Sequence, residues 1–206
     1  MKTLFIPSKA RTKVNEAKIK QIAKKLPQNI AIAYSIQFKD IANSINKILS
    51  KTHKITSLVQ VLGCSSLNFS EHTSAVLLIG SGKFHATALA FETKLPIYIL
   101  NKDSLERVSE KDIDSLEKKS KSSYLRFLNT KRVGILVSLK PGQQRLNKAL
   151  EIKKNIKLKD VYLFITNNIN IQEFENFPID SWINTACPRL DMDSKVINYK
   201  ILEKNA

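Results

Sequence analysis

Apolar and polar residues follow one another along the chain in two different rhythms. Short continuous apolar runs, typical of buried parallel strands, alternate with segments whose apolar residues recur every three or four positions, as in amphipathic helices. The predicted strands of the first part are residues 3–7, 29–36, 57–63, 74–80 and 95–101. The predicted helices between them are residues 15–26, 38–50 and 83–93. This alternation predicts a parallel sheet covered by helices.

A charged segment interrupts the alternation after the fifth predicted strand. Residues 105–130 contain neither glycine nor proline, and apolar residues such as Ile113, Leu116 and Phe127 recur there at helical spacing. This composition predicts a helical connector. The alternation then starts again, with strands predicted at residues 132–139, 160–166 and 181–186, the last of these being the final strand, and one helix at residues 143–156.

These patterns predict an α/β fold class. We expect two consecutive α/β units, each with a parallel sheet of about four to five strands flanked by helices, joined by the charged helical connector. The expected domains are residues 1–104, the connector at residues 105–130, and a smaller unit at residues 131–206. A length of 206 residues fits one large domain or two small α/β units of this kind.

The charge balance adds a hypothesis about partners. The chain carries 34 basic and 18 acidic residues, a formal net charge of +16, which attracts polyanions. The basic residues are 28 lysines and 6 arginines, spread along the whole chain. A solvated lysine surface and a surface that faces RNA or the ribosome both explain this pattern. No basic patch interleaved with aromatic residues and no known RNA-binding motif accompanies the charge.

The apolar runs and the cysteine count indicate where in the cell the protein is expected. No apolar run is long enough to span a membrane, so we expect no membrane contact. The first residues, "MKTLFIPSKAR", are too short an apolar stretch for the core of a signal peptide. Two cysteines in the whole chain do not make a disulfide framework. We therefore expect a cytoplasmic protein.

Four of the five glycines fall at or just after the carboxyl end of a predicted strand, where open parallel sheets bind ligands. The clearest case is "LLIGSGKFHATALA", in which a strand ends in Gly80, Ser81 and Gly82. A helix opens directly afterwards, with His85 in its first turn, and backbone N–H groups at such a helix start bind carboxylates or phosphates. An ordinary tight turn with a packed histidine explains the pattern equally well, and both alternatives stay open.

A second turn and two cysteines lie in comparable places. In "SLKPGQQRL", Gln143 and Gln144 stand at a predicted helix start, where their amides either bind a polar ligand or cap the helix. Cys64 and Cys187 each follow a predicted strand, one in each unit. Thiolates favour soft metals and iron–sulfur clusters, but a cluster normally needs three or four of them. The alternative is a buried cysteine that acts as a small apolar residue.

Four motifs occur in the order "VQVLGCSS", "LLIGSGKFHATALA", "LKPGQQ" and "WINTACPRLDMD". Together they resemble the diphthamide-synthesis family, an unusual group of radical-SAM enzymes in archaea and eukaryotes. The resemblance covers nearly the whole chain but begins at the family's second unit. We therefore expect the family's first α/β unit, with its cysteine, to be absent from this chain.

This resemblance implies an activity. Family members have three α/β units that each give one cysteine to a central 4Fe–4S cluster, which binds S-adenosylmethionine. Cleavage of S-adenosylmethionine yields a 3-amino-3-carboxypropyl group, which is transferred to a histidine of translation elongation factor 2 in the first step of diphthamide biosynthesis. The enzymes work as homodimers in archaea and as heterodimers in eukaryotes.

The resemblance also implies roles for particular residues. Cys64 and Cys187 match the cluster ligands of the middle and last units. Arg189, beside the second cysteine, matches a partner for a carboxylate. The residues implied to lie near the substrate are Gln37, Ser81, Gly82, His85, Gln143 and Arg189.

Several hypotheses follow. The chain is one piece of a split transferase whose partner supplies the first unit and the third cysteine, or a non-catalytic subunit that supports a complete paralogue. A third hypothesis is a reduced relative that binds a metal or an anion without radical chemistry. A hypothesis from a different functional class is a basic α/β module that binds nucleotides or RNA. It predicts salt-sensitive RNA binding that survives Cys64→Ser and Cys187→Ser.

Overall fold

The computed structural model describes most of the chain: residues 4, 6, 8–12, 14–61, 67–80, 82–102, 104–174, 176–187 and 195–205. The chain forms two compact units, Met1–Leu116 and Glu117–Ala206. Each unit contains a sheet with helices on both faces, which confirms the predicted α/β class. The division falls inside helix α4 (Glu110–Asn129), within the segment predicted as a connector.

The first unit is built around a five-stranded sheet in the order β2-β1-β3-β4-β5. The first four strands are parallel, and β5 pairs with β4 in the antiparallel sense. The strands are β1 (Asn29–Tyr34), β2 (Lys54–Gln60), β3 (Ala75–Ile79), β4 (Ile97–Asn101) and β5 (Ser104–Arg107). The helical elements are α1 (Glu16–Ala23), the short 3-10 helix η1 (Ile36–Phe38), α2 (Lys39–Leu49) and α3 (Lys83–Thr93).

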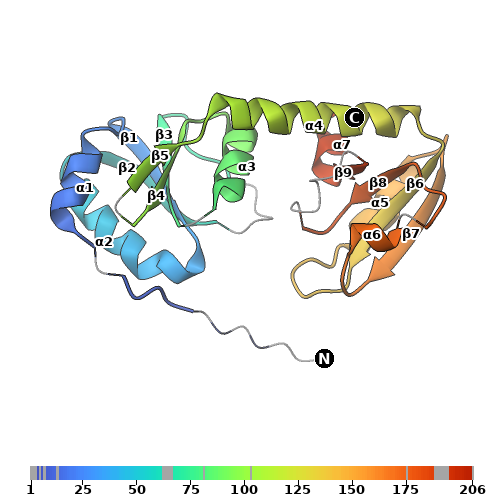
Figure 1. The fold of residues 1–206 in the computed structure, drawn as a ribbon, viewed down its shortest axis with the longest axis horizontal. Coiled ribbons are helices and arrows are strands. Elements are labelled where there is room, and N and C mark those ends of the chain that lie inside the picture. The colour runs from blue at the N-terminus through green and yellow to red at the C-terminus, as the bar shows by residue number, and fades with distance from the viewer. Residues whose placement is uncertain are drawn as a thin grey trace. The chain divides into compact units, whose positions relative to one another are not determined.

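Two apolar layers cover this sheet. The central strands β1 and β3 are buried on both faces, as their continuous apolar runs predict. Helices α1 and α2 pack on one face through residues such as Ile22 and Ile45, and α3 packs on the other through Leu89. Figure 1 shows α1 and α2 on one side of the sheet and α3 on the opposite side. Helices therefore cover both faces of the sheet.

The second unit repeats this topology with four parallel strands in the order β7-β6-β8-β9. Without β5, the first sheet has the same arrangement, so β8 stands where β3 stands in the first unit. The strands are β6 (Arg132–Ser138), β7 (Asp160–Thr166), β8 (Ser181–Asn184) and β9 (Val196–Asn198). The helices are α5 (Leu146–Asn155), α6 (Ile171–Phe174) and α7 (Tyr199–Asn205), together with the last part of α4.

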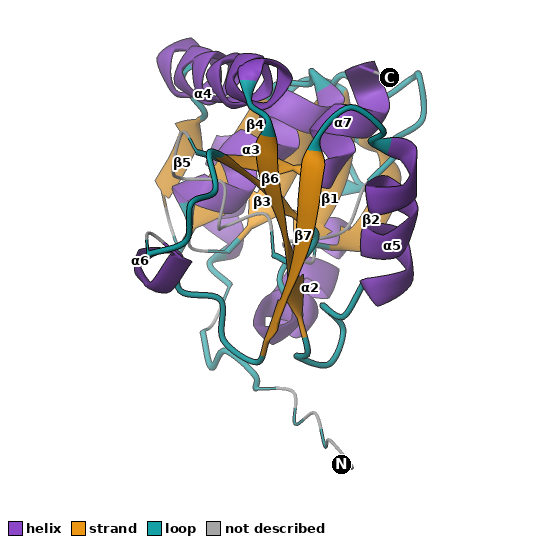
Figure 2. Ribbon diagram, turned by 90° about the vertical axis from the view of Figure 1, so that its right-hand side faces the viewer, coloured by secondary structure: helices purple, strands orange, loops and turns teal. Residues whose placement is uncertain are grey.

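The two faces of the second sheet differ in character. Helices α4, α5 and α7 pack on one face through Phe127, Ile152 and Tyr199. On the other face Trp182 lies among aromatic rings from β7 and α6. Figure 2 shows α5 and α6 on opposite sides of the sheet. The Trp182 indole packs directly on Gly134, where the absence of a side chain makes room for it.

Some of the predicted helices and strands differ from those in the structure. Residues 105–107 belong to strand β5, not to the connector helix, which begins at Glu110. The reason is long-range pairing, because β5 forms a ladder with β4 and Ser109 then caps α4 by accepting the Asp112 N–H at 3.2 Å. Leu4 and Ile6, within the strand predicted at residues 3–7, lie outside any strand and are 83% and 81% exposed.

The end of the chain also differs from the prediction. The strand at Ser181–Asn184 is not the last one, because β9 and α7 follow it. Strand β9 has only three residues, too few to show a period in the sequence. Helix α5 begins at Leu146, so Gln143 lies in the turn before the helix and not at its start.

Candidate functional site

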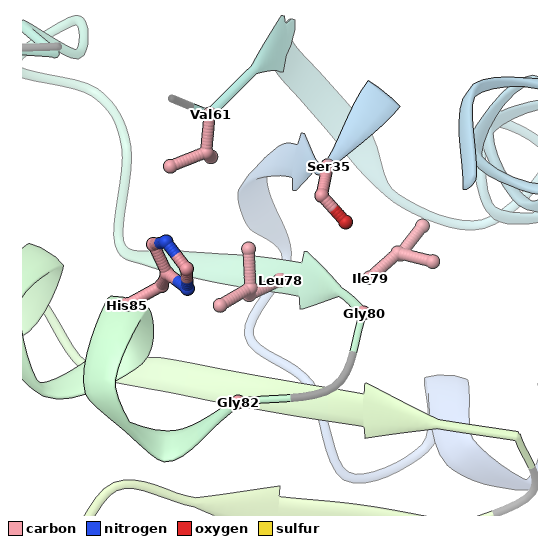
Figure 3. A pocket seen from close by; sticks show the side chains of 7 residues that line it. All are labelled: Ser35, Val61, Leu78, Ile79, Gly80, Gly82 and His85. Carbon is pink, nitrogen blue, oxygen red and sulfur yellow. The ribbon is translucent and has the colours of Figure 1, made fainter. Parts of the chain in front are cut away.

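The strand order of the first unit locates its ligand-binding edge. The chain passes from β1 to β2 on one side of the sheet and then crosses to β3 on the other, so the order reverses between β1 and β3. Open parallel sheets bind ligands outside the carboxyl ends of strands at such a reversal. A hollow of about 30 Å³ lies there (Figure 3), lined by Ser35, Val61, Leu78, Ile79, Gly80, Gly82 and His85.

Two glycines shape the turn at this β1–β3 hollow. Gly80 has a φ of 151° and Gly82 a φ of 145°, values that other residues rarely adopt. A Cβ atom on Gly80 would lie 3.1 Å from the Ser35 Oγ, so glycine also lets the strand end close to that hydroxyl. No side-chain hydrogen bond from the described residues caps α3. The helix begins beside the hollow, since Gly82 and His85 both line it, and its first backbone N–H groups lie at that end.

The positive charge at the start of α3, that of Lys83, is paired with a carboxylate. The Lys83 Nζ lies 3.1 Å from the Glu106 Oε1 on β5. The pKa of Lys83 is raised above its ordinary value. The causes are the hydrogen bond with the Glu106 carboxylate, then the negative charge of Glu106, and then that of Asp112. His85 is half-buried and lines the hollow (Figure 3). An anion bound here meets backbone N–H groups and the His85 ring, while Lys83 is engaged with a carboxylate.

The structure brings together only some of the predicted residues of this unit. Gly82 and His85 both line the hollow. Gln37 is half-buried in η1, where its carbonyl accepts the Ala10 N–H at 2.8 Å, and it is not part of the hollow's lining. Cys64 and Ser81 lie outside the described residues.

Sequence reasoning missed Ser35. It is the first residue after β1, and its hydroxyl lines the hollow beside Gly80. A single serine carries no periodic signal, but its position was available as a clue. It directly follows a buried strand at the edge where the glycine turn was expected.

The carboxyl edge of the second unit holds the described cysteine. The strand order reverses again, between β6 and β8, and Cys187 follows the end of β8 as a half-buried thiol. Asn184 and Thr185, just before it, are completely buried. Gln143 is half-buried after β6, and its N–H donates to the Lys140 carbonyl at 3.0 Å. Arg189 lies outside the described residues.

The donor groups of the described part of the chain do not complete a metal site. Within those residues, no group of three or more His, Cys, Asp or Glu side chains could hold a metal ion. Cys187 contributes a single thiol there. In the same part of the chain, none of the helices combines the length and apolar character needed to cross a membrane.

Comparison with known proteins places these features in a family. The family model of the diphthamide synthesis protein matches residues 1–201. A 2-(3-amino-3-carboxypropyl)histidine synthase of Pyrococcus horikoshii is 28% identical over 205 residues, covering 93% of this chain and 60% of the relative. The synthase of the same name from Methanocaldococcus jannaschii is 28% identical, with 97% and 59% covered. Subunit 1 of the synthase of Encephalitozoon cuniculi is 25% identical, with 93% and 58% covered.

Solved structures agree with this match. The crystal structure of Dph2 from Pyrococcus horikoshii has a TM-score of 0.81 and 26% identity, covering 95% of this chain and 63% of that chain. A crystal structure of the same protein with a 4Fe–4S cluster has a TM-score of 0.75 and 23% identity. The chain thus spans about three fifths of the length of these relatives. Because the family model matches nearly every residue, this chain belongs to the diphthamide synthesis protein family.

Proposed function

We propose that this chain is part of a 4Fe–4S enzyme that carries out the first step of diphthamide biosynthesis. The enzyme transfers the 3-amino-3-carboxypropyl group of S-adenosylmethionine to a histidine of translation elongation factor 2. The relatives that match this chain are named for this histidine modification. The observation that carries the proposal is Cys187, a half-buried thiol on a buried turn at the ligand-binding edge of a central strand.

Cys187 suits the role of a cluster ligand. Iron–sulfur clusters are held by cysteine thiolates, and partial burial of a ligand limits the access of solvent to the bound cluster. Cys64, which follows β2, is the second ligand in this proposal. The chain has two cysteines, so the third ligand comes from outside these 206 residues, either from another segment or from another chain. The cluster, when bound, supplies an electron for the cleavage of S-adenosylmethionine.

The chain's own residues bind and orient the substrate. Backbone N–H groups at the start of α3 donate hydrogen bonds to the carboxylate of the 3-amino-3-carboxypropyl group, since helix starts favour anions. The β1–β3 hollow of about 30 Å³ has room for a small polar group. A carboxylate bound there lies beside the Ser35 hydroxyl and the His85 ring.

The remaining predicted residues complete this assignment. Ser81 stands between Gly80 and Gly82 in the sequence and binds the same carboxylate in this proposal, and Arg189 supplies a guanidinium for it. Gln37 and Gln143 follow β1 and β6, from where their amides bind polar substrate atoms. The positive net charge of +16 helps to dock elongation factor 2 or its ribosomal context.

The proposal includes partners and a location. The chain works in the cytoplasm, where its acceptor is found, as half of a homodimer or heterodimer. One relative bears the name of a synthase subunit, which supports an assembly of more than one chain. The family resemblance expects one cysteine in each of these two units, and both are present in the chain. We therefore favour a catalytic assembly over a supporting, non-catalytic subunit.

Anaerobic reconstitution with iron and sulfide tests the proposal. The chain is measured alone and with a chain that supplies the expected first unit, by iron count and visible absorption. We expect about four irons per assembly with that partner. Cys64→Ser and Cys187→Ser should each lower the iron content, whereas the matched control Ser65→Ala should not. Equal iron in all variants, or no iron with the partner present, contradicts the proposal.

A further inference from the structure

The Asn184 side chain ties down the backbone that carries Cys187. Asn184 is the last residue of β8 and is completely buried. Its Oδ1 accepts the Ala186 N–H at 2.8 Å, and its Nδ2 donates to the Cys187 carbonyl at 2.8 Å. One amide thus satisfies two backbone groups beyond the point where the strand ladder ends.

Thr185 fastens the same turn to the neighbouring strand. Its Oγ1 donates to the Leu136 carbonyl of β6 at 2.7 Å, and its N–H donates to the same carbonyl at 3.2 Å. Both side chains are buried, and buried hydrogen bonds are costly to break because the freed groups lose contact with water. Hydrogen bonds therefore fix the backbone of each residue from Thr185 to Cys187.

We infer that Asn184 is a positioning residue, which fixes the Cys187 backbone so that the thiol is presented for cluster ligation. This inference rests on the proposed function for the role of the thiol. Only an amide of this length both accepts from Ala186 and donates to Cys187. Aspartate keeps the first hydrogen bond and replaces the second with a carboxylate facing a carbonyl oxygen. Alanine removes both.

Asn198 provides a matched control. It is the register partner of Asn184 on β9, is 4% exposed, and its Oδ1 accepts the N–H two residues ahead, that of Lys200, at 3.0 Å. The same substitution there removes the same type of hydrogen bond from the same sheet, at a strand end that leads directly into α7 and carries no cysteine.

Thiol reactivity tests the positioning without any metal. In a Cys64→Ser background, Cys187 is the single thiol, and its alkylation by N-ethylmaleimide is followed under native conditions. We expect Asn184→Ala to raise this alkylation rate at least about tenfold, since loss of two hydrogen bonds frees the turn to open. Asn198→Ala should stay within about twofold. Asn184→Asp, which keeps one hydrogen bond, replaces Asn184→Ala if the latter fails to fold, and equal rates for the substitutions at both positions overturn the inference.

Iron binding then separates this inference from the proposed function. With Cys64 restored, in the reconstituted assembly with the first-unit partner, we expect Asn184→Asp to weaken iron retention about 10- to 100-fold against a chelator, as for other residues that orient metal ligands. Retention like that of Asn198→Asp overturns the positioning role. If Cys187→Ser retains iron as well as the unmodified chain, the proposed function fails, while the thiol rates still report on the positioning.

Discussion

Gly134→Ala should destabilise the second unit severely, because the Trp182 ring occupies the space that the new methyl group would need. A Cβ atom added to Gly134 would lie 2.3 Å from Trp182 Cζ3 and 2.4 Å from Cε3. Carbon atoms in contact prefer about 3.5 to 4.0 Å, so the ring or the strand has to move by more than about 1 Å. The indole is 4% exposed and its ring centroid lies 4.7 Å from that of Phe164, which leaves it little freedom to yield.

The size of the effect follows from these contacts. Overpacking a core costs about 1 to 3 kcal/mol, and each disturbed aromatic pair adds about 0.5 to 1.5 kcal/mol. We expect a loss of about 3 kcal/mol in the free energy of unfolding. For a unit of this size that lowers the melting temperature by about 12 to 24 °C. Trp182 is the only tryptophan, so its fluorescence reports the unfolding of this unit directly.

Two comparisons sharpen the test. Gly142→Ala makes the same chemical change at a φ of 77° with nothing within 4 Å of the new Cβ, so it costs only the left-handed backbone strain, about 1 to 2 kcal/mol. In a Trp182→Leu background, followed by circular dichroism, Gly134→Ala should cost at least about 1.5 kcal/mol less than in the unmodified chain. An equal cost in both backgrounds would refute the steric argument.

Two further substitutions test other contacts of this unit by chemical unfolding. The Ser181 Oγ is buried without a hydrogen-bond partner among the described residues, so Ser181→Ala should leave the free energy of unfolding unchanged or raise it by up to about 1 kcal/mol, and a loss would contradict this. The Lys159 Nζ donates to the Leu128 and Thr130 carbonyls at 2.8 and 2.6 Å at the end of α4. Lys159→Met should cost about 1 to 2 kcal/mol, whereas Lys157→Met, at an exposed lysine, should be neutral, and equal costs would refute the capping role.

The sequence predicts most of the fold because most elements are specified locally. The buried strands are continuous apolar runs, and the helices show one apolar face, so both periods are visible in the chain. The exceptions depend on distant partners. Strand β5 has a polar sequence and exists through its ladder with β4, and the three residues of β9 exist through their ladder with β8. Leu4 and Ile6 have strand-forming side chains but lie outside any strand in the described structure.

The candidate site is predictable only in outline. Glycines and cysteines after buried strands indicate the carboxyl edge, and the hollow lies at that edge beside Gly80 and Gly82. Ser35 has a positional clue, since it directly follows a buried strand, but Asn184 could not be predicted, since its importance comes from what it contacts across the turn. A buried asparagine looks like a surface asparagine in the sequence until its two backbone partners are known.

The most direct test of the central claim is transfer of the labelled group itself. S-adenosylmethionine labelled in its carboxyl carbon is incubated anaerobically with elongation factor 2 and the reconstituted assembly of this chain with its first-unit partner. The account predicts label on the acceptor histidine, lost in Cys64→Ser and Cys187→Ser and retained in Ser65→Ala. Label that persists in either cysteine variant, or no label from an assembly that holds its cluster, would contradict it.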